Sequence, residues 1–141
     1  MISFQTETNF KLKQVRTYKN WLKTIIEKEN KKTGEIVYLF CNDEKMLEIN
    51  QKFLQHDFYT DIITFDNTEG QKISGDIIIS VDRVKENAQI YGVTFQNELK
   101  RVIAHGVLHL LGYKDKTKFE QDKMRQKEEE SIILFGQTTL W

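Results

Sequence analysis

The chain has 141 residues, 39% of them hydrophobic and 30% charged, and its 21 basic side chains balance its 21 acidic ones. That composition is typical of a globular protein with one domain's worth of residues, and zero net charge argues against a protein that coats nucleic acid through bulk positive charge. No apolar run approaches a membrane span and the first residues lack the apolar stretch of a signal peptide, so we expect a cytoplasmic protein.

The first third of the chain predicts two strand-then-helix pairs. Apolar residues at helical spacing mark the first helix, and branched and aromatic residues mark the second strand. The predicted elements are a strand over 2–6, a helix over 10–30, a strand over 35–41 after the break at Gly34, and a helix capped by Asn42 that carries Met46, Leu47, Ile49 and Phe53.

The middle of the chain predicts a β-hairpin. Residues 62–65 and 75–80 are short apolar runs, and residues 66–70 between them are rich in turn-forming side chains. We therefore expect two antiparallel strands.

Three helices are predicted in the remainder. The first covers 81–91 and ends at Gly92, and Thr94 can cap the second, which carries two histidines. Thr117 and Glu120 form a capping box for the last helix, which runs to about residue 135 with residues 128–130 on its solvent side.

These elements predict the fold class. We expect one α/β domain of the α+β type over residues 1–141, with a small mixed sheet of about four strands packed with about five helices. The functional site is expected at the end of the helix that bears the histidines.

The spacing of His105 and His109 predicts a metal site. Four residues advance a helix by about 400°, so both imidazoles project from one face about 6 Å apart at their bases. Gly112 can end the helix in a left-handed conformation, which lets the chain turn back and bring Asp115 to the same point. Three protein ligands leave a coordination position open, as in catalytic rather than structural zinc sites.

The helical wheel places the pair beside the core. His105 and His109 lie with Arg101 on the flank of the apolar sector, where a cleft would open, and Gly106 would let another backbone approach. Residue 106 is not a glutamate, so the helix lacks the general base of His-Glu-x-x-His metalloproteases. The ligand set alone permits zinc, iron, nickel or manganese, and a bare histidine pair can also be an ordinary boundary feature.

The one cysteine, Cys41, ends an apolar run. A single cysteine excludes an internal disulfide and a thiolate-rich zinc cage. We interpret Cys41 as a buried structural thiol and not as a nucleophile.

With its flanks, the histidine segment resembles the YbeY family of bacterial rRNA maturation factors, whose hallmark is His-Gly-x-Leu-His-Leu-x-Gly-Tyr-Asp-His. Residues 105–113 fit this pattern throughout. Residues 60–65 and 75–80 are similar to the family's Thr-Asp-Val-Leu-Ser-Phe and Gly-Asp-Ile blocks, and Asn50 is similar to an upstream Asn. The resemblance covers the chain from about residue 36 onward.

Two departures from the family pattern stand out. Lys114 and Asp115 replace the family's Asp-His, so the third ligand would be a carboxylate, and Leu54 stands where the family has an arginine thought to handle RNA. His56 and Asp57 close by are polar residues that could contact substrate or simply lie at the surface.

The resemblance implies a metal-dependent endoribonuclease, specific for single-stranded RNA, that acts on ribosomal RNA during maturation of the small ribosomal subunit. It implies one Zn²⁺ or another divalent transition metal, held by His105, His109 and Asp115, with Arg101, Lys114 and Lys116 offsetting phosphate charge. Two alternatives stay open: a zinc-dependent hydrolase of peptides or amides, and a non-catalytic ribosome-associated factor with a structural metal.

Overall fold

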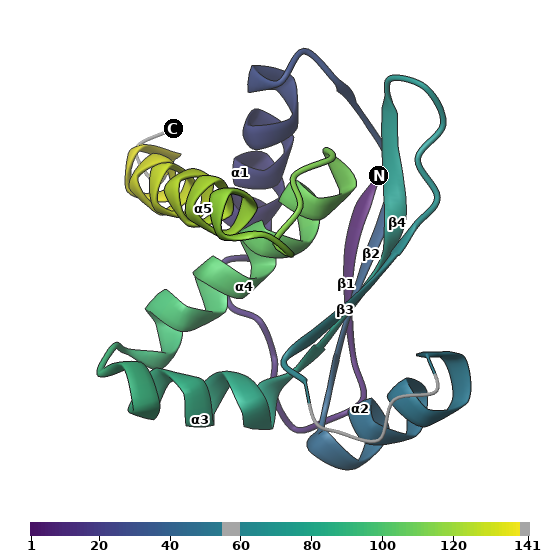
Figure 1. Ribbon diagram of the computed structural model, residues 1–141, viewed down its shortest axis with the longest axis vertical. Coiled ribbons are helices and arrows are strands. Elements are labelled where there is room, and N and C mark those ends of the chain that lie inside the picture. Colours follow the sequence, from purple (N-terminus) through teal and green to yellow (C-terminus); the bar gives the residue numbers. More distant parts are fainter. Residues whose placement is uncertain (55–59, 139–141) are drawn as a thin grey trace.

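The structure is a computed structural model that describes residues 1–54 and 60–138 (Figure 1). His56 and Asp57 lie outside the described residues, and so does the side chain of Leu54. Within the described ranges, no helix combines the length and the apolar character needed to cross a bilayer.

The strands form one mixed sheet, as expected. In spatial order they are β1 (Ile2–Thr6), β2 (Lys32–Cys41), β4 (Lys72–Ser80) and β3 (Ile62–Asp66). β1, β2 and β4 run parallel, and β3 pairs antiparallel with β4. The predicted hairpin is confirmed, and the Asp66 carboxylate accepts a hydrogen bond from the backbone N–H of Thr68 at 2.9 Å at the start of the turn.

The helices confirm most of the predicted ends. They are α1 (Val15–Lys28), α2 (Asp43–Ile49) with a π turn over Asn50–Leu54, α3 (Val81–Tyr91), α4 (Phe95–Leu110) and α5 (Lys118–Thr138). Asn42 and Thr94 cap α2 and α4 by accepting backbone N–H bonds at 2.8 and 3.1 Å. Thr117 and Glu120 form the predicted capping box. These ends are set by local side-chain chemistry, which is why the sequence reveals them.

Two predicted boundaries were wrong for tertiary reasons. The first helix begins at Val15 and not at residue 10, because Phe10 leaves the helical path to pack against Phe40 and Phe95, with ring centroids 5.1 and 5.8 Å apart. Gly34 lies inside β2 and does not precede it. A Cβ at Gly34 would stand 2.1 Å from the Ser74 hydroxyl, so glycine permits β4 to approach closely there.

Helices cover the sheet unequally. α1, α4 and α5 lie on one side of it, and α2 packs near one end of the other side (Figure 1). The main core joins the buried face of α1 to alternate residues of β2 and to α4. Two buried hydrogen bonds fix these layers: the Tyr38 hydroxyl donates to the Ile103 carbonyl and the Trp21 indole donates to the Ser131 carbonyl, both at 2.7 Å. Since Ile103 is on α4, the helix that bears the histidines is held rigidly against the sheet.

Cys41 is fully buried in the smaller core beneath α2, as predicted. Burial, reinforced by the nearby Glu7 carboxylate, raises the pKa of the thiol to about 12. At pH 8 the folded protein therefore holds the unreactive thiol form, since the thiolate is populated only as pH approaches that raised pKa. We expect negligible alkylation by iodoacetamide at pH 8 in the native protein and complete alkylation in denaturant, followed by intact mass. Rapid labelling of the native protein would contradict this assignment.

Candidate metal centre

His105 and His109 project from the C-terminal half of α4, and the chain returns to them after the helix ends. Gly112 has a φ of 103°, and its N–H and that of Tyr113 donate to the carbonyls of His109 and Leu108 at 3.0 and 3.1 Å. This is the helix stop that the glycine predicted. The Tyr113 hydroxyl then donates to Glu29, the residue that caps the C-terminus of α1, which anchors the returning segment just before Asp115.

The three side chains converge as the spacing predicted. One Asp115 carboxylate oxygen lies 3.3 Å from His105 Nε2 and 3.5 Å from His109 Nε2, and one ligand atom from each residue lies within 4.8 Å of the others. Nitrogen and oxygen ligands at 2.0–2.2 Å around a tetrahedral ion stand about 3.4 Å apart. The group could therefore hold a metal ion with little rearrangement. The three side chains are 14%, 33% and 40% exposed, so the group is at a cavity wall and not in the core.

Glu128 of α5 orients His105. Its carboxylate lies 2.6 Å from His105 Nδ1, and because a carboxylate accepts hydrogen bonds, Nδ1 carries the hydrogen and donates it. The lone pair of Nε2 is then free to face Asp115, which is the tautomer a metal ligand needs. The prediction that residues 128–130 form the solvent side of the last helix was wrong for Glu128, which is only 4% exposed.

Arg101 connects Glu128 to two further carboxylates. Its guanidinium donates to Glu98 at 2.6 and 2.9 Å, to Glu128 at 3.3 Å, and lies 3.6 Å from Asp61 of the segment entering β3. Burial would lower the pKa of Arg101, but the Glu98 hydrogen bond and the surrounding carboxylates outweigh it and raise that pKa. The guanidinium is thus a fixed positive centre within this network.

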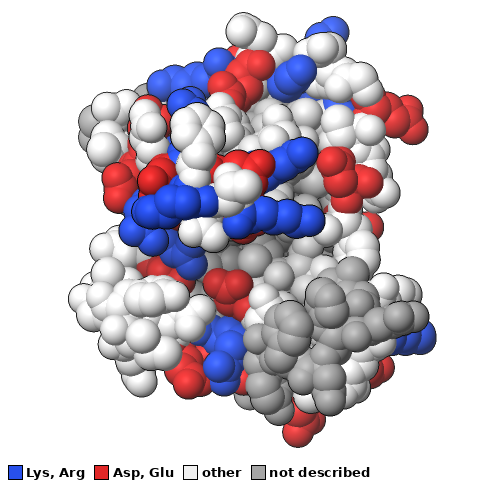
Figure 2. Space-filling model, viewed as in Figure 1, with Lys and Arg blue, Asp and Glu red and all other residues white. Residues whose placement is uncertain are grey.

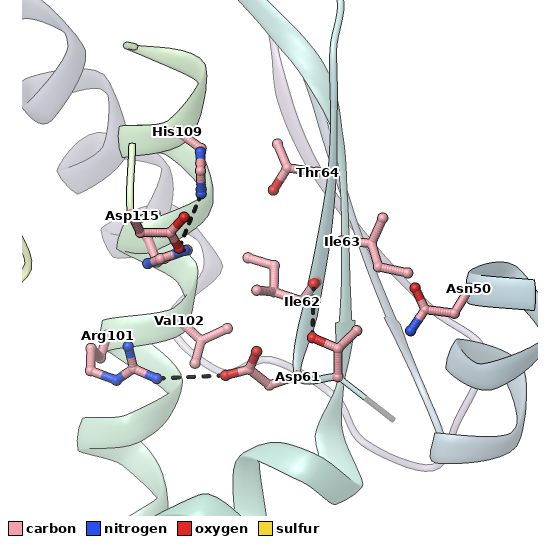
Figure 3. A pocket seen from close by; sticks show the side chains of 11 residues that line it. Asn50, Asp61, Ile62, Ile63, Thr64, Arg101, Val102, His109 and Asp115 are labelled. Carbon is pink, nitrogen blue, oxygen red and sulfur yellow. Dashed lines mark hydrogen bonds and ion pairs between the residues drawn. The ribbon is translucent and has the colours of Figure 1, made fainter. Parts of the chain in front are cut away.

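Asp61 faces the histidine group from the opposite wall. Figure 3 shows Arg101 and His109 of α4, and Asp115 of the segment after it, across a cavity from Asp61 and the β3 residues Ile62 and Thr64. The cavity has a volume of about 420 Å³. Burial raises the pKa of Asp61 despite the opposing effects of Arg101 and His105. A partly buried carboxylate of raised pKa, across a cavity from a group that could hold a metal ion, is a candidate general base.

Gly106 brings α4 close to the sheet, although not in the way the sequence predicted. A Cβ at this position would stand 2.8 Å from a methyl of Ile77 and 3.2 Å from Ile62. The close approach is therefore by isoleucine side chains and not by another backbone. The absence of a side chain at residue 106 lets the histidine helix lie close to both β4 and β3.

The three residues predicted to contact substrate differ in their surroundings: two are exposed lysines and one is an arginine that is paired with carboxylates. Lys114 and Lys116 flank Asp115, and both side chains are exposed, with no ion pair in the described part of the chain. Arg101 lines the cavity but already binds carboxylates.

Sequence reasoning missed Glu98, Glu128 and Asp61. A signal existed for Glu128, because it shares helical spacing with the buried residues Met124, Ser131 and Phe135.

The fold and the site together define a small α/β protein in which two histidines and an aspartate that could hold a metal ion stand at the wall of a cavity. The family described as "Endoribonuclease YbeY" matches residues 1–136, and the chain belongs to this family. Its membership supports an endoribonuclease role.

Relatives of this family are similar in sequence to the chain over nearly its whole length. An Endoribonuclease YbeY of Christiangramia forsetii is 52% identical over 134 residues, covering 95% of this chain and 94% of the relative. One of Flavobacterium psychrophilum is 51% identical over 135 residues, with 96% of each covered. The solution structure of a Thermotoga maritima protein is similar, with a TM-score of 0.64, 29% identity and coverage of 93% of this chain and 89% of that one.

Proposed function

We propose that residues 1–141 act as one domain, a zinc-dependent endoribonuclease that cleaves single-stranded RNA. We further propose that it works in the cytoplasm on ribosomal RNA during maturation of the small ribosomal subunit. The observation that carries the proposal is the approach of one Asp115 oxygen to both histidine Nε2 atoms, at 3.3 and 3.5 Å, beside a cavity of about 420 Å³.

The donor set favours zinc. Two imidazoles and one carboxylate match a three-ligand catalytic zinc site, and Glu128 supplies the outer hydrogen bond that such histidines need. A bound zinc ion supplies Lewis-acid activation of water and of a phosphoryl oxygen. We assign His105, His109 and Asp115 as its ligands.

The chain's own residues would hold the substrate. Lys114 and Lys116 extend from the segment that carries Asp115, so their ammonium groups can offset phosphate charge next to the ligand group. The exposed part of Arg101 faces the same cavity, and we propose a substrate contact there in addition to its internal carboxylate contacts.

The deciding experiment measures metal content and RNA cleavage on the same preparation. We expect about one zinc per chain, cleavage of single-stranded RNA in preference to duplex, loss of cleavage with chelator, and recovery with zinc. Cleavage of peptides but not RNA would favour an amide hydrolase. Full zinc occupancy without any cleavage, combined with binding to small ribosomal subunits, would favour a non-catalytic factor.

Replacing Glu128 by glutamine should weaken zinc binding about 10- to 100-fold, because an outer partner that fixes a ligand's tautomer typically contributes that much to affinity. Competition titration against a chromophoric chelator measures the change. Glu130→Gln is the matched control, since it removes the same charge from an exposed position on α5. Equal zinc affinity in both variants would show that Glu128 does not orient the ligand.

A further inference from the structure

A second cavity adjoins the ligand group on the side away from β3. It lies between α4 and α5, has a volume of about 560 Å³, and shares Arg101, His105 and Asp115 with the first cavity. These three side chains therefore form a wall common to both cavities. The ligand group can be approached from either side.

The second cavity is also lined by groups suited to a nucleotide. Tyr91, the last residue of α3, is 61% exposed, so a face of its ring is available for stacking. Arg125 of α5 lines the same cavity and makes no ion pair with the other described residues. An aromatic face and a guanidinium in the same cavity are a common means of binding a base and its phosphate.

Charges of both signs lie along this cavity, since Arg101 and Arg125 line it together with Glu98, Asp115, Glu128 and Glu129. Residues 114–127, which lead into α5 and form its first half, contain six basic and three acidic side chains. Figure 2 shows Lys and Arg side chains over α5, with Asp and Glu side chains among them, above a hollow in this face. Glu98 and Glu128 are paired with Arg101, so the attraction of a polyanionic strand would come from the basic side chains of residues 114–127.

An endonuclease must accommodate the strand on both sides of the bond it cleaves, and a single cavity ending at the ligand group would not. We propose that the cavity between α4 and α5 is a second RNA subsite, which binds the nucleotide next to the cleaved linkage. Tyr91 stacks on its base and Arg125 binds its phosphate. This inference rests on the proposed function and specifies the path of its substrate.

Binding of single-stranded RNA to the full-length protein tests the role of Tyr91. Fluorescence anisotropy with oligouridylates of increasing length should show about tenfold weaker binding for Tyr91→Ala, with the loss confined to oligomers long enough to reach past the ligand group. Tyr91→Phe should bind like wild type, because it keeps the ring face. Ile90→Ala, at an exposed neighbour outside the cavity, should also bind like wild type.

The salt dependence tests Arg125. Arg125→Gln should reduce the slope of log affinity against log salt by about one, as expected for one lost phosphate contact. Lys85→Gln, at an exposed position on α3 outside both cavities, should leave the slope unchanged.

If wild type binds and cleaves RNA but Tyr91→Ala matches Ile90→Ala at every length, the second subsite is refuted while the proposed function stands. If wild type neither binds nor cleaves RNA, both fail.

Discussion

Replacing His109 by alanine should abolish stable zinc binding and reduce RNA cleavage to background. The substitution leaves only His105 and Asp115 of the three-ligand group. Losing a ligand should lower zinc affinity by more than the roughly 100-fold that loss of an outer hydrogen-bond partner can cost. His109 is a third exposed at the cavity wall, so its removal creates no buried void and the fold should persist. Elemental analysis and a single-stranded RNA cleavage assay measure the two effects.

The matched control for His109→Ala is Gln96→Ala, which shortens an exposed side chain on the same helix. Both variants should unfold at nearly the same temperature as wild type when all three are stripped of metal. Full zinc occupancy in His109→Ala would contradict its assignment as a ligand. Wild-type cleavage in that variant would show that the hydrolytic site lies elsewhere.

The part of the site that the sequence predicts is the part set by local geometry. His105 and His109 come together through helical spacing, and Gly112 reverses the chain because it tolerates a positive φ. Asp115 follows within three residues, so little conformational freedom separates it from the pair. The same logic explains the caps at Asn42 and Thr94, whose partners are three residues away.

The remainder of the site depends on contacts distant in sequence. Glu128 stands among exposed glutamates, and only the docking of α5 on α4 places it 2.6 Å from His105. Asp61 faces α4 because β3 adds to the edge of the sheet next to β4. A charge-dense stretch is usually a solvated helix face, and that general tendency failed at Glu128 because Arg101 and His105 give its carboxylate partners within the fold.

Asp61 is placed to supply the general base that the histidine helix lacks. With glycine at residue 106, α4 itself offers no carboxylate to accept a proton from attacking water. Asp61 lines the cavity opposite the ligand group but is not one of its three members. Its raised pKa makes it a stronger base than an ordinary aspartate, and the Arg101 guanidinium 3.6 Å away holds the carboxylate in place.

Asp61→Asn should therefore lower kcat for RNA cleavage by about 10²- to 10⁴-fold while zinc content stays at one per chain, because an amide cannot accept the proton but keeps the size and the hydrogen-bonding oxygen of the carboxylate. Asp76→Asn makes the same chemical change at an exposed position of β4, beside a different cavity, and should leave kcat unchanged. Single-turnover cleavage with the protein in saturating excess over RNA, with zinc measured in each sample, separates the chemical step from binding. A loss of zinc in Asp61→Asn would make Asp61 a structural support of the ligand group. Unchanged kcat with full zinc would leave the activation of water to the metal alone.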